Sequence, residues 1–278
     1  MHLKAAASLA PRLVEAQRSL RSTNMHDPDC IWLEDQTTIA FLLGGFLWVD
    51  ILSSISLRSK PLLELCHESL LVQDSTWIKM FGCDDRTLLL LFKINKLDNW
   101  KKEREKSGIL SVAELAKRGA QIELELEQVL RTPLESPTKA HISARPAAPS
   151  SSQDTCSEFS RIFALAATTY LHVVISGAYP SLPEINRSVI RTLKALHALR
   201  DTALLVRLVW PFCVTGCLAL EKDQNLVQEI VRAQTTETDT LEQAFKVVQQ
   251  CWEDRRAGHR NRDWTSSMES IGQCILLL

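Results

Sequence analysis

Two cysteines have the spacing that could support chemistry. Cys213 and Cys217 stand four positions apart in the apolar run LVWPFCVTGCLAL, residues 208–220. On a helix such a pair shares one face, so the thiolates could bind a metal ion or form a redox pair. A tetrahedral zinc site needs two more ligands, and no Cys or His with suitable local spacing supplies them. The eight cysteines include no C-x-x-C pair, so reduced, buried thiols and no metal site are predicted.

Other catalytic patterns give no site either. The sequence has no G-x-S-x-G, no H-E-x-x-H and no phosphate-binding glycine loop, so no catalytic residue is predicted. Glu123 and Glu125 point to different helix faces and do not form an acid/base couple. His172 lies in an apolar helix, which favours a core or pocket residue. His172 and Trp210 are therefore the candidates for lining a pocket for a small apolar effector.

The composition favours helices that bury a large core. The chain has 278 residues, 45% of them apolar and 23% charged, with only 9 glycines and 2 tyrosines. Leu and Ala are abundant, as helices prefer. The net charge is -1, from 32 basic and 33 acidic residues. Nucleic-acid binding usually shows as a basic domain, so no DNA-binding residue is predicted, although a local basic face stays open.

One Pro/Ser-rich segment divides the chain. Residues 132–155 contain four of the ten prolines and few large apolar residues, which predicts a long flexible loop. We expect an N-terminal helical half, residues 1–131, and a C-terminal helical half, residues 156–278. The first 24 residues resemble a mitochondrial presequence, but their apolar side chains share one helical face, so a docked amphipathic helix is preferred.

The N-terminal half is expected to form three helices. They are a buried helix over 37–57 with Thr37 or Thr38 at its cap, a helix over 86–104, and the most periodic helix over 111–130. Ser111 and Glu114 have the spacing of a capping box at the start of the third helix.

The C-terminal half is expected to begin with a long apolar helix over 157–177 that ends at Gly177. Pro183 is expected in the first turn of the next helix, with Ser181 and Glu184 as a capping box. Two further helices are centred on 226–231 and 241–252. Asp263 is expected to cap a last helix before an apolar C-terminus that must pack on the protein.

The run from 203 to 220 is about long enough to cross a bilayer. Arg207 lies inside it, however, and an arginine is costly in lipid. Pro211 removes a backbone hydrogen bond, which should kink or break a helix there. A buried, kinked core helix is therefore preferred over a membrane span, and Trp210, Pro211, Gly216 and Cys217 are expected to be structural.

Several short sequence segments match the motif pattern of a known protein family. It consists of a Tyr-Leu-His helix, a Pro-x-Ile turn and a Trp-Pro-x-x-x-x-Gly-Cys core, matched here by Tyr170, Leu171, His172, Pro183, Ile185, Trp210, Pro211, Gly216 and Cys217. LWVDILSSIS, MFGCDDRTLLLLFKINKLDNWK and DWTSSMESIGQCILLL are also similar, including Asp50, Gly82 and Cys83. Together they resemble the C-terminal regulatory region of fungal transcription factors that carry a six-cysteine zinc binuclear cluster, over most of the chain.

The resemblance implies a multi-helix regulatory domain that contacts transcriptional coregulators and modulates transcription by RNA polymerase II. The family's zinc cluster normally precedes this region, and no cysteine hexad is present here, so no cofactor and no direct DNA contact are expected. A nuclear location is implied, with the cytoplasm left open because that N-terminal portion is absent. Two alternatives stay open: a helical enzyme of unknown reaction, and a helical interaction scaffold unrelated to transcription.

Overall fold

The computed structural model describes residues 31–62, 83–131, 151–199, 201–233, 239–272 and 277. Within these ranges every regular element is a helix, so the all-α prediction is confirmed. The elements are α2 (Ile31–Ser56), α4 (Asp85–Lys106), α5 (Val112–Arg131), α6 (Ser151–Ser176), α7 (Pro183–His197), the 3-10 helix η2 (Thr202–Arg207), α8 (Val209–Cys217), the 3-10 helix η3 (Glu221–Asp223), α9 (Gln224–Arg232), α10 (Asp239–Arg256) and α11 (Trp264–Ser270).

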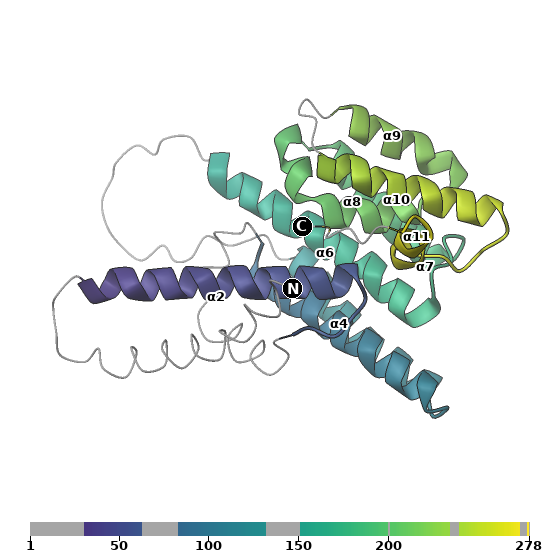
Figure 1. Cartoon of the computed structure of the whole chain (residues 1–278), viewed down its shortest axis with the longest axis horizontal. Coiled ribbons are helices and arrows are strands. Elements are labelled where there is room, and N and C mark those ends of the chain that lie inside the picture. Colours follow the sequence, from purple (N-terminus) through teal and green to yellow (C-terminus); the bar gives the residue numbers. More distant parts are fainter. Residues whose placement is uncertain are drawn as a thin grey trace.

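Helix α6 lies at the centre of the fold. It packs against α4 and α5 of the N-terminal half and against α7 and α8 of the C-terminal half. Figure 1 shows it running diagonally between α2 and α4 on one side and α8, α9 and α10 on the other. From Phe159 to Val174 nearly every side chain is buried, as expected of a helix that is apolar on most sides. One hydrophobic core therefore extends across both halves of the chain.

The same helix is the one described segment that could cross a membrane by length and composition. Over Cys156–Ser176 its mean hydropathy is 1.3, but 83% of the apolar window is buried inside the protein. The core helix of a water-soluble fold passes the same test, so this segment is explained by packing alone.

Helix α5 follows its sequence pattern closely. Leu115, Gly119, Ile122 and Leu126 are buried on one face. Gly119 permits a close approach to α6, because a Cβ there would lie 2.4 Å from Cδ1 of Ile175. The cap of this helix forms in part: the N–H of Glu114 donates to Oγ of Ser111 at 3.3 Å, while the Glu114 carboxylate pairs with Arg118 at 2.8 Å.

Two predicted boundaries are wrong. Helix α2 begins at Ile31, so Thr37 and Thr38 lie within it and do not cap it. Helix α6 begins at Ser151, so the last five residues of the predicted loop 132–155 are helical. In both places the helix begins six residues before its predicted start, because helical hydrogen bonding can continue through residues of modest intrinsic propensity. The first 24 residues and residues 132–150 lie outside the described ranges.

Helix α7 confirms its predicted apolar face. Ile185, Val189 and Leu193 are fully buried, and Pro183 occupies the first turn, where a missing N–H costs no helical bond. The capping box is wrong, however: Leu182 is the N-cap and has no side-chain cap bond. Glu184 instead accepts a hydrogen bond from Oγ of Ser176 at 3.2 Å.

The run from 203 to 220 is buried from Leu208 to Ala219, as predicted, but Ala203 and Arg207 are exposed and the geometry differs. It forms η2 and then α8, with the break at Leu208 and not at Pro211. Pro211 is the third residue of α8, inside the first turn, where the backbone N–H groups have no helical acceptor. The proline therefore marks the start of a short helix and produces no kink.

The end of the chain also follows its pattern. The Asp263 carboxylate accepts a hydrogen bond from the N–H of Ser266 at 3.0 Å and so caps α11, as predicted. Gly177, which ends α6, has a φ of +84°, the left-handed conformation that a helix C-cap favours. Leu277, the described residue nearest the end of the sequence, is fully buried in the core.

Candidate functional site

His172 lies on α6 and contacts α5. Its Nε2 is 3.1 Å from Oε1 of Glu123, and only 8% of the residue is exposed. Its Nδ1 is buried and has no hydrogen-bond partner among the described residues. Neither cavity described below is lined by His172. Its role in an effector pocket therefore stays a prediction.

Trp210 lies in the middle of the core. Its ring stacks on Phe163, with 5.9 Å between centroids and 13° between planes, and meets the ring of Tyr170 edge-on at 6.1 Å. Trp210 is 1% exposed, and its buried Nε1 has no hydrogen-bond partner among the described residues. Tyr170 and His172 are two positions apart on α6 and so face different sides. The structure thus does not bring Trp210 and His172 together.

The cysteine pair belongs to a buried cluster. Cys213, Cys217 and Cys251 are free thiols with no exposed surface. Burial raises the pKa of Cys217, and a hydrogen bond with Cys217 followed by burial raises the pKa of Cys251. Both thiols are therefore protonated at neutral pH, which disfavours metal binding and nucleophilic attack. The described residues contain no group of three or more His, Cys, Asp or Glu side chains placed to hold a metal ion.

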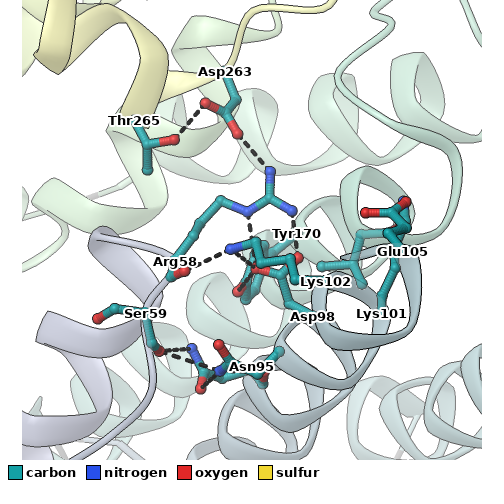
Figure 2. A network of polar contacts seen from close by, with 12 residues as sticks. Arg58, Ser59, Asn95, Asp98, Lys101, Lys102, Glu105, Tyr170, Asp263 and Thr265 are labelled. Atoms are coloured by element: carbon teal, nitrogen blue, oxygen red, sulfur yellow. Dashed lines mark hydrogen bonds and ion pairs between the residues drawn. The ribbon is translucent and has the colours of Figure 1, made fainter. Parts of the chain in front are cut away.

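A buried ion network joins the end of α2 to α4 and to the N-terminus of α11. We call it the junction network; it consists of Arg58, Asp98, Lys102, Tyr170 and Asp263. Nε of Arg58 donates to Oδ2 of Asp98 at 3.0 Å, and its Nη1 donates to Oδ2 of Asp263 at 2.5 Å. Nζ of Lys102 is 2.9 Å from Oδ2 of Asp98. Figure 2 shows the Arg58 guanidinium between the two carboxylates.

Side chains of α4 and α11 also fix the end of helix α2 and the residues just after it. The last carbonyls of a helix have no partner within it, and here Trp264 supplies one for Ser56, while side chains of α4 bind the carbonyls just beyond the helix end. Nε1 of Trp264 donates to the carbonyl of Ser56 at 2.8 Å, and Nζ of Lys102 donates to that of Arg58. Nδ2 of Asn95 donates to the carbonyl of Ser59 at 3.1 Å. These bonds hold Arg58 at a φ of 47°, which a non-glycine residue seldom adopts.

The charges of the junction network stabilise one another. Burial alone would raise the pKa of Asp263, but Arg58 and the N–H of Ser266 outweigh it, and the pKa lies below its ordinary value. Burial opposes the charge on Arg58, yet Asp98 and Asp263 together hold the pKa of the guanidinium above its ordinary value. Burial, followed by the nearby Asp98 carboxylate, raises the pKa of the Tyr170 hydroxyl.

Two positive and two negative groups thus meet with every charge paired. Asp98 is fully buried, and Arg58 is 17% exposed. A paired, hydrogen-bonded set of this kind fixes the relative positions of α2, α4 and α11. The network is therefore a structural centre of the fold.

Two cavities open elsewhere in the described residues. One, of about 570 Å³, lies beside α4 and α5. Its charged lining is largely satisfied: Nζ of Lys93 is 2.6 Å from Oε2 of Glu125, and the Arg118 guanidinium lies 4.5 Å from the centre of the Trp100 ring. The other, of about 260 Å³, lies where the α6–α7 loop meets the segment after α8 and the end of α10. We call it the C-terminal cavity.

Sequence reasoning missed the junction network in part. Asp263 was found as a helix cap, but its ion pair was not predicted. Asp98 could have been found, because it lies four residues after Ile94 and continues the apolar stripe of α4. A charged residue on a buried stripe indicates a buried partner. Arg58 gives no such signal, since it follows the end of α2.

Comparison with known proteins gives a consistent result. Residues 1–278 match the family model described as the fungal specific transcription factor domain. The transcription factor dibT of Pestalotiopsis microspora is 30% identical over 94% of this chain and 44% of its own length. The trichothecene biosynthesis transcription regulator TRI10 of Fusarium sporotrichioides is 26% identical over 100% of this chain and 67% of its own length.

A third relative is the ustiloxin B cluster transcription factor ustR of Aspergillus flavus, which is 30% identical over 84% of this chain and 41% of its own length. The chain therefore spans about half the length of these relatives. No solved structure matches it.

Proposed function

We propose, because this chain belongs to the fungal-specific transcription factor domain family, that it modulates transcription by RNA polymerase II from a fungal biosynthetic gene cluster. The observation that carries the proposal is the family match, which extends over all 278 residues. The chain is thus a transcription-factor regulatory domain. The names of two relatives refer to trichothecene biosynthesis and to the ustiloxin B cluster, which supports a cluster regulator here.

The chain is proposed to act through binding to other molecules, without catalysis. Its buried charges are paired in the junction network, and its clustered thiols are held protonated by burial. Both observations favour a binding domain over the alternative of a helical enzyme. The partners that fit this role are transcriptional coregulators, and the location is the nucleus.

DNA contact is proposed to lie outside this domain. The chain carries 32 basic and 33 acidic residues, so its total charge offers no attraction to phosphate. A regulatory domain can change the output of a DNA-bound protein only if partners or effectors bind one of its conformations more tightly than another.

A reporter assay tests the proposal. The full chain is fused to an unrelated DNA-binding domain, and transcription of a reporter gene is measured in a fungal cell. We expect output to change relative to the DNA-binding domain alone, and Asp98→Ala, which unpairs the junction network, to abolish the change. Glu127→Ala, at an exposed i,i+4 pair with Arg131, is the matched control and should leave output unchanged.

The result against the proposal is equally clear. A fusion that is folded, nuclear and as abundant as the control, yet leaves reporter output unchanged, contradicts a role in transcription. Capture of partner proteins by that silent fusion would instead support the alternative of an interaction scaffold. Turnover of any compound by the purified chain would revive the enzyme alternative.

A further inference from the structure

The C-terminal cavity is built by three segments that are distant in sequence. Tyr179 and Pro180 come from the α6–α7 loop, Leu220 from the segment after α8, and Trp252 from α10. The remaining lining is dominated by arginines near the end of α10. A ligand in this cavity would therefore touch the three segments at once.

Three arginines line the cavity: Arg255, Arg256 and Arg260. The acidic residue in the lining is Glu221, so the local charge is positive. Nη2 of Arg256 donates to Oε1 of Gln224 at 3.2 Å, a neutral partner that leaves its charge uncompensated. Arg260 is exposed and pairs with no acidic residue in the described part of the chain.

Arg255 is the most unusual of the three. Its Nη2 donates to the carbonyl of Cys217, at the C-terminus of α8, and this bond fixes the guanidinium. Its Nη1 is buried and has no hydrogen-bond partner among the described residues. Burial lowers the pKa of Arg255, which is the mark of a charge without a carboxylate partner. In the junction network, by contrast, Arg58 meets two carboxylates.

The apolar wall is held rigidly. Nε1 of Trp252 donates to the carbonyl of Gly216 at 2.9 Å, and its ring meets that of Phe245 edge-on at 6.2 Å. The α6–α7 loop is fixed by the N–H of Ala178, which donates to Oδ1 of Asn261 at 2.8 Å. A preformed pocket of this kind binds its ligand with little cost of ordering.

We propose that the C-terminal cavity binds a small organic carboxylate with one or two rings. The rings would lie against Trp252, and the carboxylate would accept hydrogen bonds from Arg260 and lie beside the positive charge of Arg255, whose Nη1 has almost no surface open to the cavity. Planar guanidinium groups suit carboxylates, which they can bind through two parallel hydrogen bonds. Size agrees as well, because a dry cavity of about 150 Å³ holds a benzene molecule and this one has about 260 Å³.

The consequence of binding rests on the proposed function. If the chain regulates transcription, binding of a carboxylate metabolite would make that regulation depend on the metabolite's concentration. Binding itself is independent of that role. A ligand that holds three segments together would favour the conformation in which they meet.

Calorimetric titration of the full chain tests the site. The probes are 2-naphthoate, its neutral analogue 2-naphthamide, and inorganic phosphate. We expect one saturable site for 2-naphthoate, with 2-naphthamide binding at least about tenfold more weakly because charge-assisted hydrogen bonds are lost. Phosphate should also bind at least about tenfold more weakly, because it has no ring to place against Trp252.

Three variants locate the site. Arg255→Met keeps an unbranched apolar side chain of similar length and should weaken 2-naphthoate binding at least about tenfold. Arg260→Ala changes an exposed residue, so folding is not at risk, and should weaken binding about three- to tenfold. Arg131→Ala removes the same charge from α5, where the side chain is 79% exposed, and should leave affinity unchanged.

Several results would overturn the proposal. They are no binding of 2-naphthoate, equal binding of the acid and the amide, phosphate binding as tight as that of naphthoate, or unchanged affinity in Arg260→Ala. If 2-naphthoate does not bind but the reporter fusion changes transcription, the carboxylate site is rejected and the proposed function stands. If 2-naphthoate binds but the fusion leaves reporter transcription unchanged, the proposed function is rejected and the carboxylate site stands.

Discussion

The junction network and the C-terminal cavity contain the same kind of group in opposite states. In the junction network, the Arg58 guanidinium bonds to the carboxylates of Asp98 and Asp263. In the cavity, Arg255 bonds to one backbone carbonyl and leaves its buried Nη1 without a partner. The first arrangement pairs each charge within the protein, whereas the described residues give Arg255 no carboxylate partner. This difference is the reason why we place a ligand beside Arg255 and not beside Arg58.

Asp98→Ala should have the largest effect on stability. It leaves Arg58 and Lys102 without their shared carboxylate, and breaking a buried pair in this way costs about 3–5 kcal/mol. The free energy of unfolding in urea measures the loss. Glu127→Ala, at an exposed pair, should change it by less than about 0.5 kcal/mol. A loss below about 1 kcal/mol in Asp98→Ala would show that the junction network does not hold the helices.

Gly177→Ala should have an intermediate effect next to the cavity. Its φ of +84° disfavours a side chain, and a Cβ would lie 2.9 Å from the Tyr179 ring. We expect destabilisation of about 1–2 kcal/mol, because both backbone strain and the displaced ring contribute. Naphthoate affinity should fall as well, since Tyr179 lines the cavity. Gly258→Ala is the matched control: its φ is +96°, but no atom lies near its Cβ position. Equal naphthoate affinity in Gly177→Ala and Gly258→Ala would show that the α6–α7 loop does not contribute to the binding site.

The pH dependence of stability sharpens the contrast further. The pKa of Asp263 is lower in the folded state than in the unfolded chain, where Asp titrates near about 3.9. Its stabilising contribution is therefore complete above that unfolded pKa and is lost as pH falls through the folded one. We expect the free energy of unfolding of the parent to fall more steeply below about pH 4 than that of Asp263→Asn. Parallel profiles would mean that Asp263 titrates alike in both states.

Arg255→Met should have the smallest effect on stability. It removes one hydrogen bond to Cys217, worth about 1 kcal/mol, but also removes a desolvated charge. The two changes nearly cancel, so the free energy of unfolding should stay within about 1 kcal/mol of the parent. A loss of unfolding free energy close to that of Asp98→Ala would show that Arg255 stabilises the fold as Arg58 does. The two regions would then not differ.

Local patterns predicted much of the fold. The stripe of α5, the buried face of α7, the Asp263 cap and the Gly177 C-cap all depend on residues within one or two turns. Pro211 shows the limit of this reasoning, since a proline costs a hydrogen bond only if the helix has already begun. The sequence does not state where α8 starts, and η2 before it moves the start to Val209.

The sites were less predictable because they join distant segments. Arg58 and Asp263 are 205 positions apart, and no local spacing indicates such a pair. Arg255 and Arg256 look like the charged, solvated end of α10, although the fold turns both toward a cavity. His172 and Trp210 are pocket candidates from local context alone, and the structure places His172 on a different side of α6 from Tyr170, whose ring meets Trp210. Their role as effector contacts stays a prediction.

Arg58 has carboxylate partners within the protein, whereas Arg255 has none among the described residues. The most direct test of this difference is the titration of 2-naphthoate into folded Arg255→Met. We expect a protein about as stable as the parent that has lost at least about nine-tenths of its affinity for the acid. Retention of parental affinity would contradict it, because the buried guanidinium would then not be the group that the carboxylate meets.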